Sequence, residues 1–397
     1  MSNDTQPEIR FPGFTEDWEE RKLIDLVVRL NKSTNSSRLP KVEFEDIVAG
    51  EGRLNKDVSQ KFDNRKGIEF LPNDILYGKL RPYLKNWLKA TFTGVAIGDF
   101  WVFRAKKSDS DFIYSLIQAD RYQKAANDTS GTKMPRSDWK KVSDTVFYIP
   151  NDLKEQQKIG IFFKKLDDTI ALHQRKLDLL KETKKGFLQK MFPKNGAKVP
   201  EIRFPGFTED WEERKLQEVL RERNNQQPQS TEYPLVSFTV ENGVTPKTDR
   251  YEREQLVVGD KSSKKYKVTV LNDIVYNPAN LKFGAISRNK YGNAVFSPIY
   301  ITFLVNNDVT TPEFIEMFVT RNDFIKRALK YQQGTVYERQ SVSPTDLLAM
   351  NVYLPGKSEQ EKIGSFFQQL DETIALHQRK LDLLKETKKG FLQKMFV

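Results

Sequence analysis

The chain has 397 residues, of which 38% are hydrophobic and 12% aromatic, so it is long enough for two or three folded domains and is not disordered by composition. It contains no cysteine, which excludes disulfides, thiolate catalysis and cysteine-based metal sites and suits a reducing cytoplasm. Its net charge of +11 suits a polyanionic partner such as nucleic acid, although many cytoplasmic proteins are as basic.

Two segments occur twice, letter for letter. PEIRFPGFTEDWEERKL stands at 7–23 and 200–216, and TIALHQRKLDLLKETKKGFLQKMF at 169–192 and 373–396. Self-similarity of this kind indicates a tandem duplication. In chain order we predict a first block (1–23), a first variable domain (24–150), a long helix (151–192), a linker (193–199), a second block (200–216), a second variable domain (217–355) and a second long helix (356–397).

The two variable domains differ in sequence but share their pattern. Alternating β-branched and aromatic residues predict strands at 265–271 and 299–305, and apolar periodicity predicts helices at 110–126 and 311–330. Each domain ends in a β-like segment closed by proline, VFYIP at 146–150 and NVYLP at 351–355. We therefore expect an α+β protein in which one mixed α/β fold holds two divergent sequences. No apolar run is long enough to enter or span a membrane.

Both long helices carry a narrow apolar seam at alternating steps of four and three, which is typical of a coiled coil. The seam residues are Phe163, Leu166, Ile170, His173, Leu177 and Leu180 in the first copy, and Phe367, Leu370, Ile374, His377, Leu381 and Leu384 in the second. The obvious partner of each helix is the other copy, and antiparallel pairing would close the chain into a pseudo-twofold object. Thirty-eight helical residues make a rod of ~57 Å, long enough to act as a spacer.

The only two histidines, His173 and His377, lie at equivalent seam positions. We interpret them as a register device, because a metal site needs more ligands and a catalytic role needs a carboxylate partner. Leu172, Leu179, Leu376 and Leu383 lie beside the seam and widen the apolar stripe, which would suit packing against helices of another subunit.

Three partial motifs do not amount to an active site. The GKS at 356–358 lacks the first glycine of a phosphate loop, and NPAN at 277–280 departs from the Asn-Pro-Pro-aromatic loop of amino-methyltransferases. The lysines of the E-T-K triplets at 182–184 and 386–388 lie on the helix seam. No catalytic residue, metal site or cofactor is therefore predicted on this chain, which has the features of a reader rather than of a catalyst.

The order of block, variable domain and helix, repeated once, resembles the specificity subunit of type I restriction-modification enzymes. The residues that carry the resemblance are the repeated FPGFTEDWEERKL, the YIP or YLP followed by Glu155-Gln156 or Glu359-Gln360, and the GFLQKMF helix end. The resemblance implies two target-recognition domains, each reading one half of an asymmetric bipartite sequence in double-stranded DNA. It also implies docking of two modification (methyltransferase) subunits, which carry S-adenosylmethionine, and of restriction (endonuclease and translocase) subunits, which use ATP and Mg²⁺.

Basic and amide side chains in loops of the variable domains are the best candidates for DNA contacts, because these groups pair with base edges and phosphates. The candidates are Lys79, Arg81, Tyr83, Thr132, Lys133 and Arg136 in the first domain, and Lys282, Arg288, Asn289, Lys290, Thr335, Tyr337, Arg339 and Gln340 in the second. The alternative to DNA recognition is a duplicated coiled-coil adaptor whose globular domains bind proteins.

Overall fold

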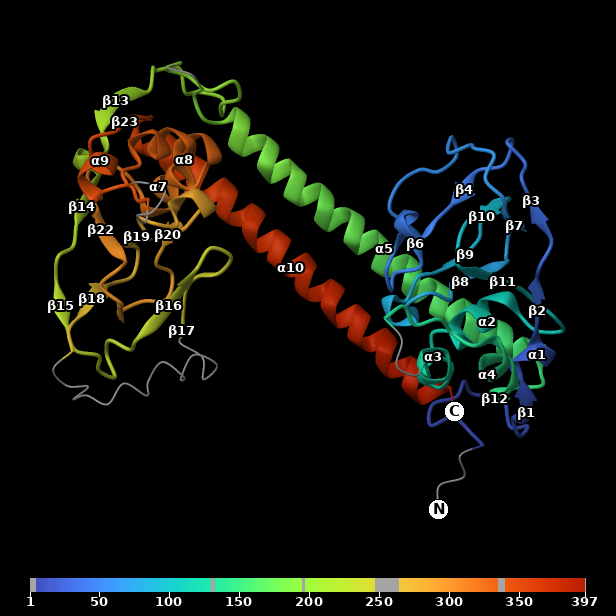
Figure 1. The fold of residues 1–397 in the computed structure, drawn as a ribbon. Helices are drawn as coiled ribbons and strands as arrows, with labels where there is room; N and C mark the ends of the chain where they lie inside the picture. The colour runs from blue at the N-terminus through green and yellow to red at the C-terminus, as the bar shows by residue number, and fades with distance from the viewer. Residues whose placement is uncertain (1–4, 130–132, 195–196, 247–263, 335–339, 397) are drawn as a thin grey trace. The chain divides into compact units, whose positions relative to one another are not determined.

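The computed structural model describes residues 5–129, 133–194, 197–246, 264–334 and 340–396. The chain divides into two compact units: the first comprises Met1–Leu177 with Leu376–Val397, and the second comprises Asp178–Ala375. Both boundaries fall inside the two long helices, α5 (Leu153–Lys190) and α10 (Lys357–Met395) (Figure 1). Each unit therefore contains one variable domain, the start of one long helix and the end of the other.

The first unit contains two four-stranded sheets. One has the strand order β2 (Val27–Leu30), β11 (Phe100–Ala105), β8 (Ile75–Gly78) and β9 (Trp87–Lys89), all antiparallel. The other has the order β3 (Ser33–Thr34), β7 (Gly67–Phe70), β10 (Gly94–Ala96) and β4 (Lys41–Val42), in which only the last pair is parallel. A small pair is formed by β5 (Ile47–Val48) and β6 (Arg53–Leu54). The helical elements are α1 (Leu23–Leu26), η1 (Phe44–Asp46), η2 (Pro82–Leu84), α2 (Ser110–Leu116), α3 (Asp120–Asn127) and α4 (Trp139–Asp144).

The second unit repeats this topology with different residues. Its main sheet has the order β14 (Leu220–Glu222), β22 (Ile301–Val305), β19 (Ile274–Tyr276) and β20 (Ile286–Arg288). A second sheet has the order β15 (Gln226–Gln227), β18 (Tyr266–Thr269) and β21 (Ala294–Phe296), and β16 (Val236–Thr239) pairs with β17 (Gly243–Pro246). The helical elements are α6 (Leu216–Val219), η4 (Leu281–Phe283), α7 (Pro312–Val319), α8 (Asn322–Ala328), η5 (Leu329–Tyr331) and α9 (Pro344–Leu348). The expectation of one mixed α/β fold with two divergent sequences is confirmed.

The two predicted helices of the variable domains are each broken in two. Residues 110–126 form α2 and α3, and residues 311–330 form α7, α8 and η5. At each break one residue has an extended backbone, Ala119 (ψ 152°) in the first unit and Arg321 (ψ 142°) in the second. The break turns the following helix so that Tyr122 and Phe324 become fully buried. Tertiary packing thus overrides a continuous helical pattern.

The repeated block joins each variable domain to its own end. In the first unit β1 (Glu19–Lys22) pairs antiparallel with β12 (Val146–Ile149). In the second unit β13 (Glu212–Lys215) pairs in the same way with β23 (Asn351–Leu354). The repeated EERK and the β-like segments before proline are therefore the two strands of one ribbon, which closes each variable domain at its base.

A buried ion pair fastens the block to the start of each long helix. Arg10 donates to both carboxylate oxygens of Glu155 over 2.6 and 2.8 Å, and Arg203 donates to both oxygens of Glu359 over 2.7 Å. Trp18 adds a bond from its indole nitrogen to Glu155 at 3.3 Å. Both glutamates are almost completely buried, so they need these partners. This accounts for the glutamate of the repeated Glu-Gln pair.

The glutamine of the same pair fastens the variable domain to the helix. The side-chain nitrogen of Gln156 donates to the Pro150 carbonyl at 2.8 Å, and its oxygen accepts from the Asp109 backbone at 3.0 Å. Gln360 bonds in the same way to the Pro355 carbonyl at 2.9 Å and to Thr310 Oγ1 at 2.7 Å. Each glutamine therefore links the start of its long helix to the residues just before α2 in the first unit or α7 in the second.

The repeated Met-Phe at the end of each long helix enters a hydrophobic core. In the first unit the ring centre of Phe396 lies 5.5 Å from that of Phe112 and 5.8 Å from that of Phe163. In the second unit the ring centre of Phe192 lies 5.6 Å from that of Phe314 and 5.9 Å from that of Trp211. Each helix therefore starts in the core of one unit and ends in the core of the other.

Within each unit the two helices run antiparallel, as the seam predicts. In the first unit Lys388 pairs with Asp167, and His377 lies beside His173 with 3.3 Å between their Nδ1 atoms. In the second unit Lys184 pairs with Asp371. The central seam residues Phe163, Leu177, Phe367 and Leu381 are buried. The four flanking leucines, Leu172, Leu179, Leu376 and Leu383, are exposed.

Candidate nucleic-acid interface

Two loops that are far apart in the sequence meet in the first unit. The loop after β8 carries Lys79 and Arg81, and the segment before α4 carries Arg136. Leu80 and Arg136 form an isolated antiparallel bridge, and the Arg81 backbone donates to the Pro135 carbonyl at 2.7 Å. The Ser137 backbone donates to the Lys79 carbonyl at 2.8 Å. Four of the predicted contact residues, Lys79, Arg81, Tyr83 and Arg136, are therefore carried by one paired loop system, with exposed Lys133 three residues before Arg136.

The cations of this loop system share one carboxylate. Arg136 Nη2 lies 2.9 Å from Asp99 Oδ2, and Lys79 Nζ lies 3.7 Å from Asp99 Oδ1. The side chains of Arg136 and Lys79 are both solvent-accessible, so these pairs are worth little in stability. Such weakly held cations can exchange Asp99 for a phosphate at small cost.

The loop after β8 has an unusual backbone. Arg81 (φ 50°) and Lys85 (φ 57°) are both left-handed and stand on either side of η2. Non-glycine residues in this region are uncommon, and such strain clusters at binding loops. Between them the Tyr83 side chain is 56% exposed. Lys85 was not among the predicted contacts, because a positive φ at a lysine leaves no signal in the sequence.

The second unit places a matching turn after β19. Lys282 and Phe283 belong to η4, which Gly284 ends with a left-handed φ of 87°. Phe283 is 65% exposed, and Lys282 Nζ lies 5.0 Å from the centre of its ring. An exposed aromatic beside a lysine can stack on a base or ribose while the cation meets a phosphate. Phe283 was also missed, because exposure of a Phe cannot be inferred from sequence.

The segment before α9 is brought to the same turn. Gln333 and Ser341 exchange two backbone hydrogen bonds of 2.9 and 3.0 Å, and the Val342 backbone donates to the Pro278 carbonyl at 3.2 Å. Gln340, a predicted contact, is exposed beside this bridge. The predicted contacts Thr335, Tyr337 and Arg339, and Thr132 in the first unit, lie outside the described residues.

Three other predicted contacts lie away from this turn. Arg288 is opposite Ile274 in the β19–β20 pair, whereas Lys282 belongs to the connection at the other end of these strands. Arg288 is largely buried and donates to Glu313, to Glu316 at 3.0 Å and to Asn272 at 2.8 Å. Its place in the fold is a link between the sheet and α7.

Asn289 and Lys290 follow the same strand. The side-chain nitrogen of Asn289, which is 0% exposed, donates to Thr269 Oγ1 and to the carbonyls of Val270 and Gly292. Asn289 therefore serves the local turn. Lys290 is exposed but pairs with Glu316 at 2.9 Å. A basic or amide residue in a sequence does not reveal whether its own domain supplies the partner.

The rest of the site chemistry can be stated briefly. In the described parts of the chain there is no cluster of three or more His, Asp or Glu residues that could hold a metal ion. Among the helices that the structure describes, none has the length and apolar character needed to cross a membrane.

A duplicated frame that holds two different domains, each with a paired set of exposed loops, defines a two-part recognition protein rather than a single binding domain. The model of the family described as the type I restriction modification DNA specificity domain matches residues 15–182 and again residues 208–386. The two matches cover most of the chain, so the protein belongs to the family of type I restriction-modification specificity subunits.

Individual relatives agree with this assignment. The chain is 25% identical to the specificity subunit of the type I restriction enzyme MjaVIII from Methanocaldococcus jannaschii over 305 residues, which is 72% of this chain and 68% of that protein. The S subunit of a type I restriction-modification system from M. genitalium matches with a TM-score of 0.61 at 12% identity, covering 99% of both chains. A chain from a structure of type I R-M complex assembly and conformational transition matches with a TM-score of 0.52 at 16% identity, covering 94% of this chain and 96% of that one. These structures share the fold of this chain.

Proposed function

We propose that each variable domain reads one half of an asymmetric, bipartite sequence in double-stranded DNA, and that the two long helices hold the domains in register. The observation that carries the proposal is the pairing of loops: in both units a turn after the third strand of the main sheet order meets the segment before the last short helix. Membership in the DNA specificity family supports DNA as the ligand of these loops. The differing loop sequences supply the asymmetry, since the frame around them is the same.

The proposed contacts are the exposed members of these loops. In the first unit they are Lys79, Arg81, Tyr83, Lys133 and Arg136, and Lys85 is added because its left-handed backbone ends the same loop. In the second they are Lys282 and Gln340, with Phe283 added because it is exposed. Lys290, which lies away from this turn and pairs with Glu316, stays in the proposal on its exposure alone. Thr132, Thr335, Tyr337 and Arg339 belong to the same proposal on their sequence alone. Arg288 and Asn289 are left to the packing roles described above.

Spacing follows from the helices. If the rod of α5 and α10 sets the separation of the two domains, the half-sites should lie roughly one helical turn apart, about 34–36 Å from centre to centre. Insertion of whole residues near a helix end should then change the gap between half-sites and leave the half-sites themselves unaltered.

We further propose that the exposed helix face docks two modification subunits. Leu172 and Leu376 are each 58% exposed, and Leu179 and Leu383 are each 67% exposed. Large apolar side chains repeated on a helix face are typical of a protein interface. In this scheme S-adenosylmethionine is bound by the modification subunits, and ATP and Mg²⁺ are used by restriction subunits, while this chain catalyses nothing.

One experiment tests the main proposal. The chain is co-expressed with its cognate modification subunit, and methylated positions are mapped across the host genome. A bipartite motif with two different halves and a fixed gap supports the proposal, whereas a palindrome or the lack of any motif contradicts it.

The alternative is an adaptor whose domains bind proteins. It predicts DNA affinity that is weak and insensitive to salt, whereas phosphate contacts make affinity fall steeply with salt concentration. Titration of labelled duplex with the assembled complex at ~50 and ~200 mM salt separates the two, because six or more phosphate contacts reduce affinity by about 10³ or more over that range.

A further inference from the structure

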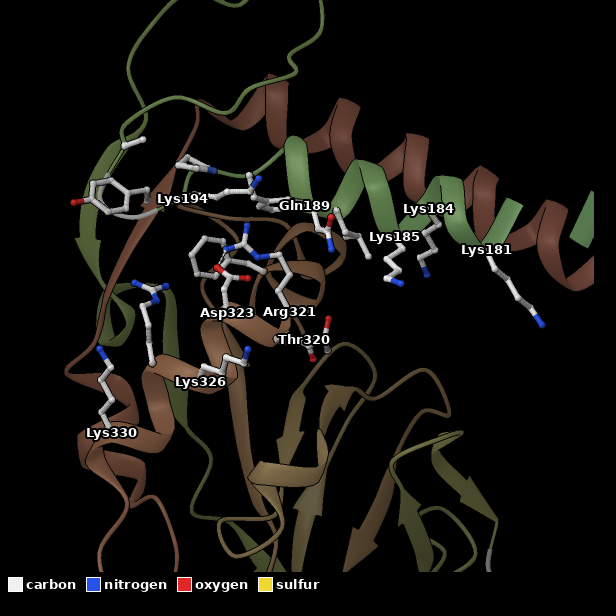
Figure 2. A pocket seen from close by; sticks show the side chains of 18 residues that line it. Lys181, Lys184, Lys185, Gln189, Lys194, Thr320, Arg321, Asp323, Lys326 and Lys330 are labelled. Atoms are coloured by element: carbon white, nitrogen blue, oxygen red, sulfur yellow. Dashed lines mark hydrogen bonds and ion pairs between the residues drawn. The ribbon is translucent and has the colours of Figure 1, made fainter. Parts of the chain in front are cut away.

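A basic cavity lies in the second unit, between the end of α5 and the α7–α8 helices (Figure 2). Its volume is about 880 Å³, within the range of small-molecule sites. Six lysines and two arginines line it, and among the described lining residues the only carboxylate is Asp323. Figure 2 shows Lys184 and Lys185 projecting from α5 on the side where Arg321 and Asp323 lie. The cavity is thus a concentration of positive charge distinct from the loops proposed above to contact DNA.

Arg321 is the unusual residue of this cavity. It is only 8% exposed, and its guanidinium carbon lies 4.4 Å from the ring centre of Phe192 and 4.9 Å from that of Phe318. Nη2 donates to Asp323, but Nε is buried and has no hydrogen-bond partner among the described residues. A buried, unpaired donor on a charged group is costly, so the arrangement is incomplete without an acceptor.

The charge of Arg321 persists despite its burial. Desolvation lowers its pKa to about 10, and nearby Arg327 acts in the same direction. Asp323 opposes this shift and is itself half exposed. At neutral pH the guanidinium is therefore protonated. It lies against two aromatic rings whose planes are 64° apart, and its Nε is unpaired among the described residues.

In the first unit the end of α10 repeats the sequence of the end of α5, and there the variable domain supplies hydrogen-bond acceptors for the polar side chains of the helix. Lys385, Lys388 and Gln393 are the counterparts of Lys181, Lys184 and Gln189 in the exact repeat. Lys385 bonds to Glu51 at 3.1 Å, and Gln393 bonds to Asp120 at 3.1 Å. Lys388 bonds to Gln118 at 2.6 Å.

The second unit replaces these acceptors. Thr320 and Asn322 stand where the α2–α3 segment has Gln118 and Asp120, and Arg321 stands where it has the small Ala119. Lys184 keeps its pair with Asp371, and Lys194 pairs with Glu201 at 2.8 Å. No ion-pair partner of Lys181 or Lys326 is found in the part of the chain that the structure describes. Lys185 pairs with Glu182 of its own helix at 3.5 Å. The two copies of this helix face thus have different surroundings: in the first unit the domain supplies Glu51 and Asp120 as acceptors, whereas in the second unit six lysines and two arginines share the cavity with Asp323.

We propose that the basic cavity binds a phosphate-bearing ligand, with one phosphate at the guanidinium of Arg321 beside Asp323 and further phosphates among the lysines of α5 and α8. A guanidinium edge presents two parallel donors that match two phosphate oxygens, and the surrounding lysines suit more than one negative charge. The ligand is either a free nucleotide or a backbone phosphate of nucleic acid, which share this chemistry. The proposal does not depend on target recognition by the variable loops.

The test uses the full-length chain and sodium tripolyphosphate, which carries phosphates and nothing else. Binding is measured by isothermal titration calorimetry at low salt. Lys185→Glu is compared with Lys389→Glu, the same change at the equivalent position of the same repeated sequence in the other unit. We expect Lys185→Glu to weaken binding roughly tenfold or more, while Lys389→Glu stays within about twofold of the unaltered chain.

Arg321→Met is the second variant, because methionine keeps an apolar stem between Phe192 and Phe318. We expect it to abolish measurable tripolyphosphate binding. If the unaltered chain does not bind tripolyphosphate, or if Lys389→Glu weakens binding as much as Lys185→Glu, the proposal is overturned. It is equally overturned if tripolyphosphate fails to bind and Lys185→Glu instead weakens association with a partner subunit, which would point to an acidic protein segment.

Two further titrations identify the source of the phosphate. ATP and a short duplex without the target sequence are each added to the tripolyphosphate complex. Displacement by ATP alone assigns the cavity to a free nucleotide, and displacement by the duplex assigns it to nucleic acid backbone. Displacement by neither, at concentrations well above that of tripolyphosphate, contradicts both sources and with them the proposal.

Discussion

The two units share a frame that is nearly identical in sequence and hold domains that are not, and the difference separates two kinds of constraint. In the frame, meaning the two blocks and the two long helices, the same buried contact is formed twice: Arg10 with Glu155, and Arg203 with Glu359. The loops after β8 and β19 have the same place in the topology but share no such contact. In these ion pairs both partners are repeated, whereas the loops differ in sequence.

The equivalence of the units is not complete even where the sequence is. The indole nitrogen of Trp18 donates to Glu155, whereas that of Trp211, its exact repeat, is buried and has no hydrogen-bond partner among the described residues. Gly160 and Gly364 also occupy the same place in the repeat but face different neighbours. The variable domain therefore adjusts the frame on which it sits, and matched substitutions in the two copies can measure by how much.

Removal of the buried arginine should have the largest effect. Arg203→Ala leaves Glu359, which is 1% exposed, without its ion-pair partner, and an unpaired buried charge costs about 3–5 kcal/mol. Arg10→Ala should cost less, because Trp18 still donates to Glu155. Urea unfolding of the two variants measures the difference. Equal losses of unfolding free energy would show that the indole bond contributes nothing and that the two frames are energetically the same.

The paired helix glycines should separate the two units next. An alanine Cβ at Gly160 would lie 2.7 Å from the Phe112 backbone nitrogen and 2.7 Å from Asp109 Oδ1. At Gly364 the nearest atom is Glu313 Cβ at 3.2 Å. Gly160→Ala should therefore destabilise by about 1–3 kcal/mol through overpacking. Gly364→Ala should be close to neutral, because the gain of up to about 1 kcal/mol in helix propensity offsets the tighter contact.

The same unfolding measurements check this prediction. Both substitutions change the same residue in a similar local sequence, so most of the helix-propensity term cancels in the comparison. A Gly364→Ala variant that is as unstable as Gly160→Ala would mean that α7 lies as close to its long helix as α2 does.

Substitutions in the loops should show whether each unit reads its own half-site of the DNA. Arg136→Ala should lower discrimination at one base pair of the first half-site by about 1–3 kcal/mol if the side chain reads a base, and leave the second half-site untouched. Lys282→Ala should lower discrimination at the second half-site only, if the side chain reads a base. If it contacts phosphate instead, the substitution should weaken binding to all sequences alike. Competition binding of the assembled methyltransferase with single-base variants of its target gives both values. A loss spread over both half-sites for Arg136→Ala would contradict the assignment of one half-site to each unit.

Much of this architecture was predictable because it is written in repeats and periodicity. The exact copies predict the duplicated frame, and the seam predicts that the two long helices pair with each other. Closure of the chain favours antiparallel pairing, and the β-like segments before Pro150 and Pro355 predict the last strand of each domain. The repeats, the seam and the β-like segments are local patterns or self-matches, which a single sequence contains. The family was predicted from the resemblance of the repeated segments to those of specificity subunits.

The surface of each domain was less predictable for a physical reason. Arg288 and Lys282 are both basic residues in one loop-like stretch, yet Arg288 is bound by Glu313 and Glu316 of α7 while Lys282 is exposed. The difference depends on contacts between residues more than twenty positions apart. Likewise, nothing local marks Arg321 as buried or Lys85 as left-handed. Long-range pairing decides which cations are free.

The histidine pair should produce the smallest effect, and it lies where the repeated helices meet their own copy. The pKa of His173 is lowered by desolvation and by the charges of Lys380, His377 and Lys176. His377 Nδ1 is 3.3 Å from His173 Nδ1, so protonation of both rings would place two positive charges side by side. A histidine whose folded pKa is depressed binds its proton more weakly in the folded chain than in the unfolded one. Stability is therefore unaffected above the ordinary histidine pKa near 6.5 and falls as the pH drops below it.

This prediction is tested by urea unfolding at pH 7.5 and 5.5, where most carboxylates remain ionised. We expect the unaltered chain to lose stability on acidification and the double variant His173→Gln, His377→Gln to lose less. Asp167, whose pKa is raised by burial, acts in the opposite direction and is present in both proteins, so it cancels in the difference. Equal losses in the two proteins would show that protonation of His173 does not destabilise the fold. The seam position would then be explained by register alone, since an uncharged amide at both sites could replace the two rings without consequence for pH dependence.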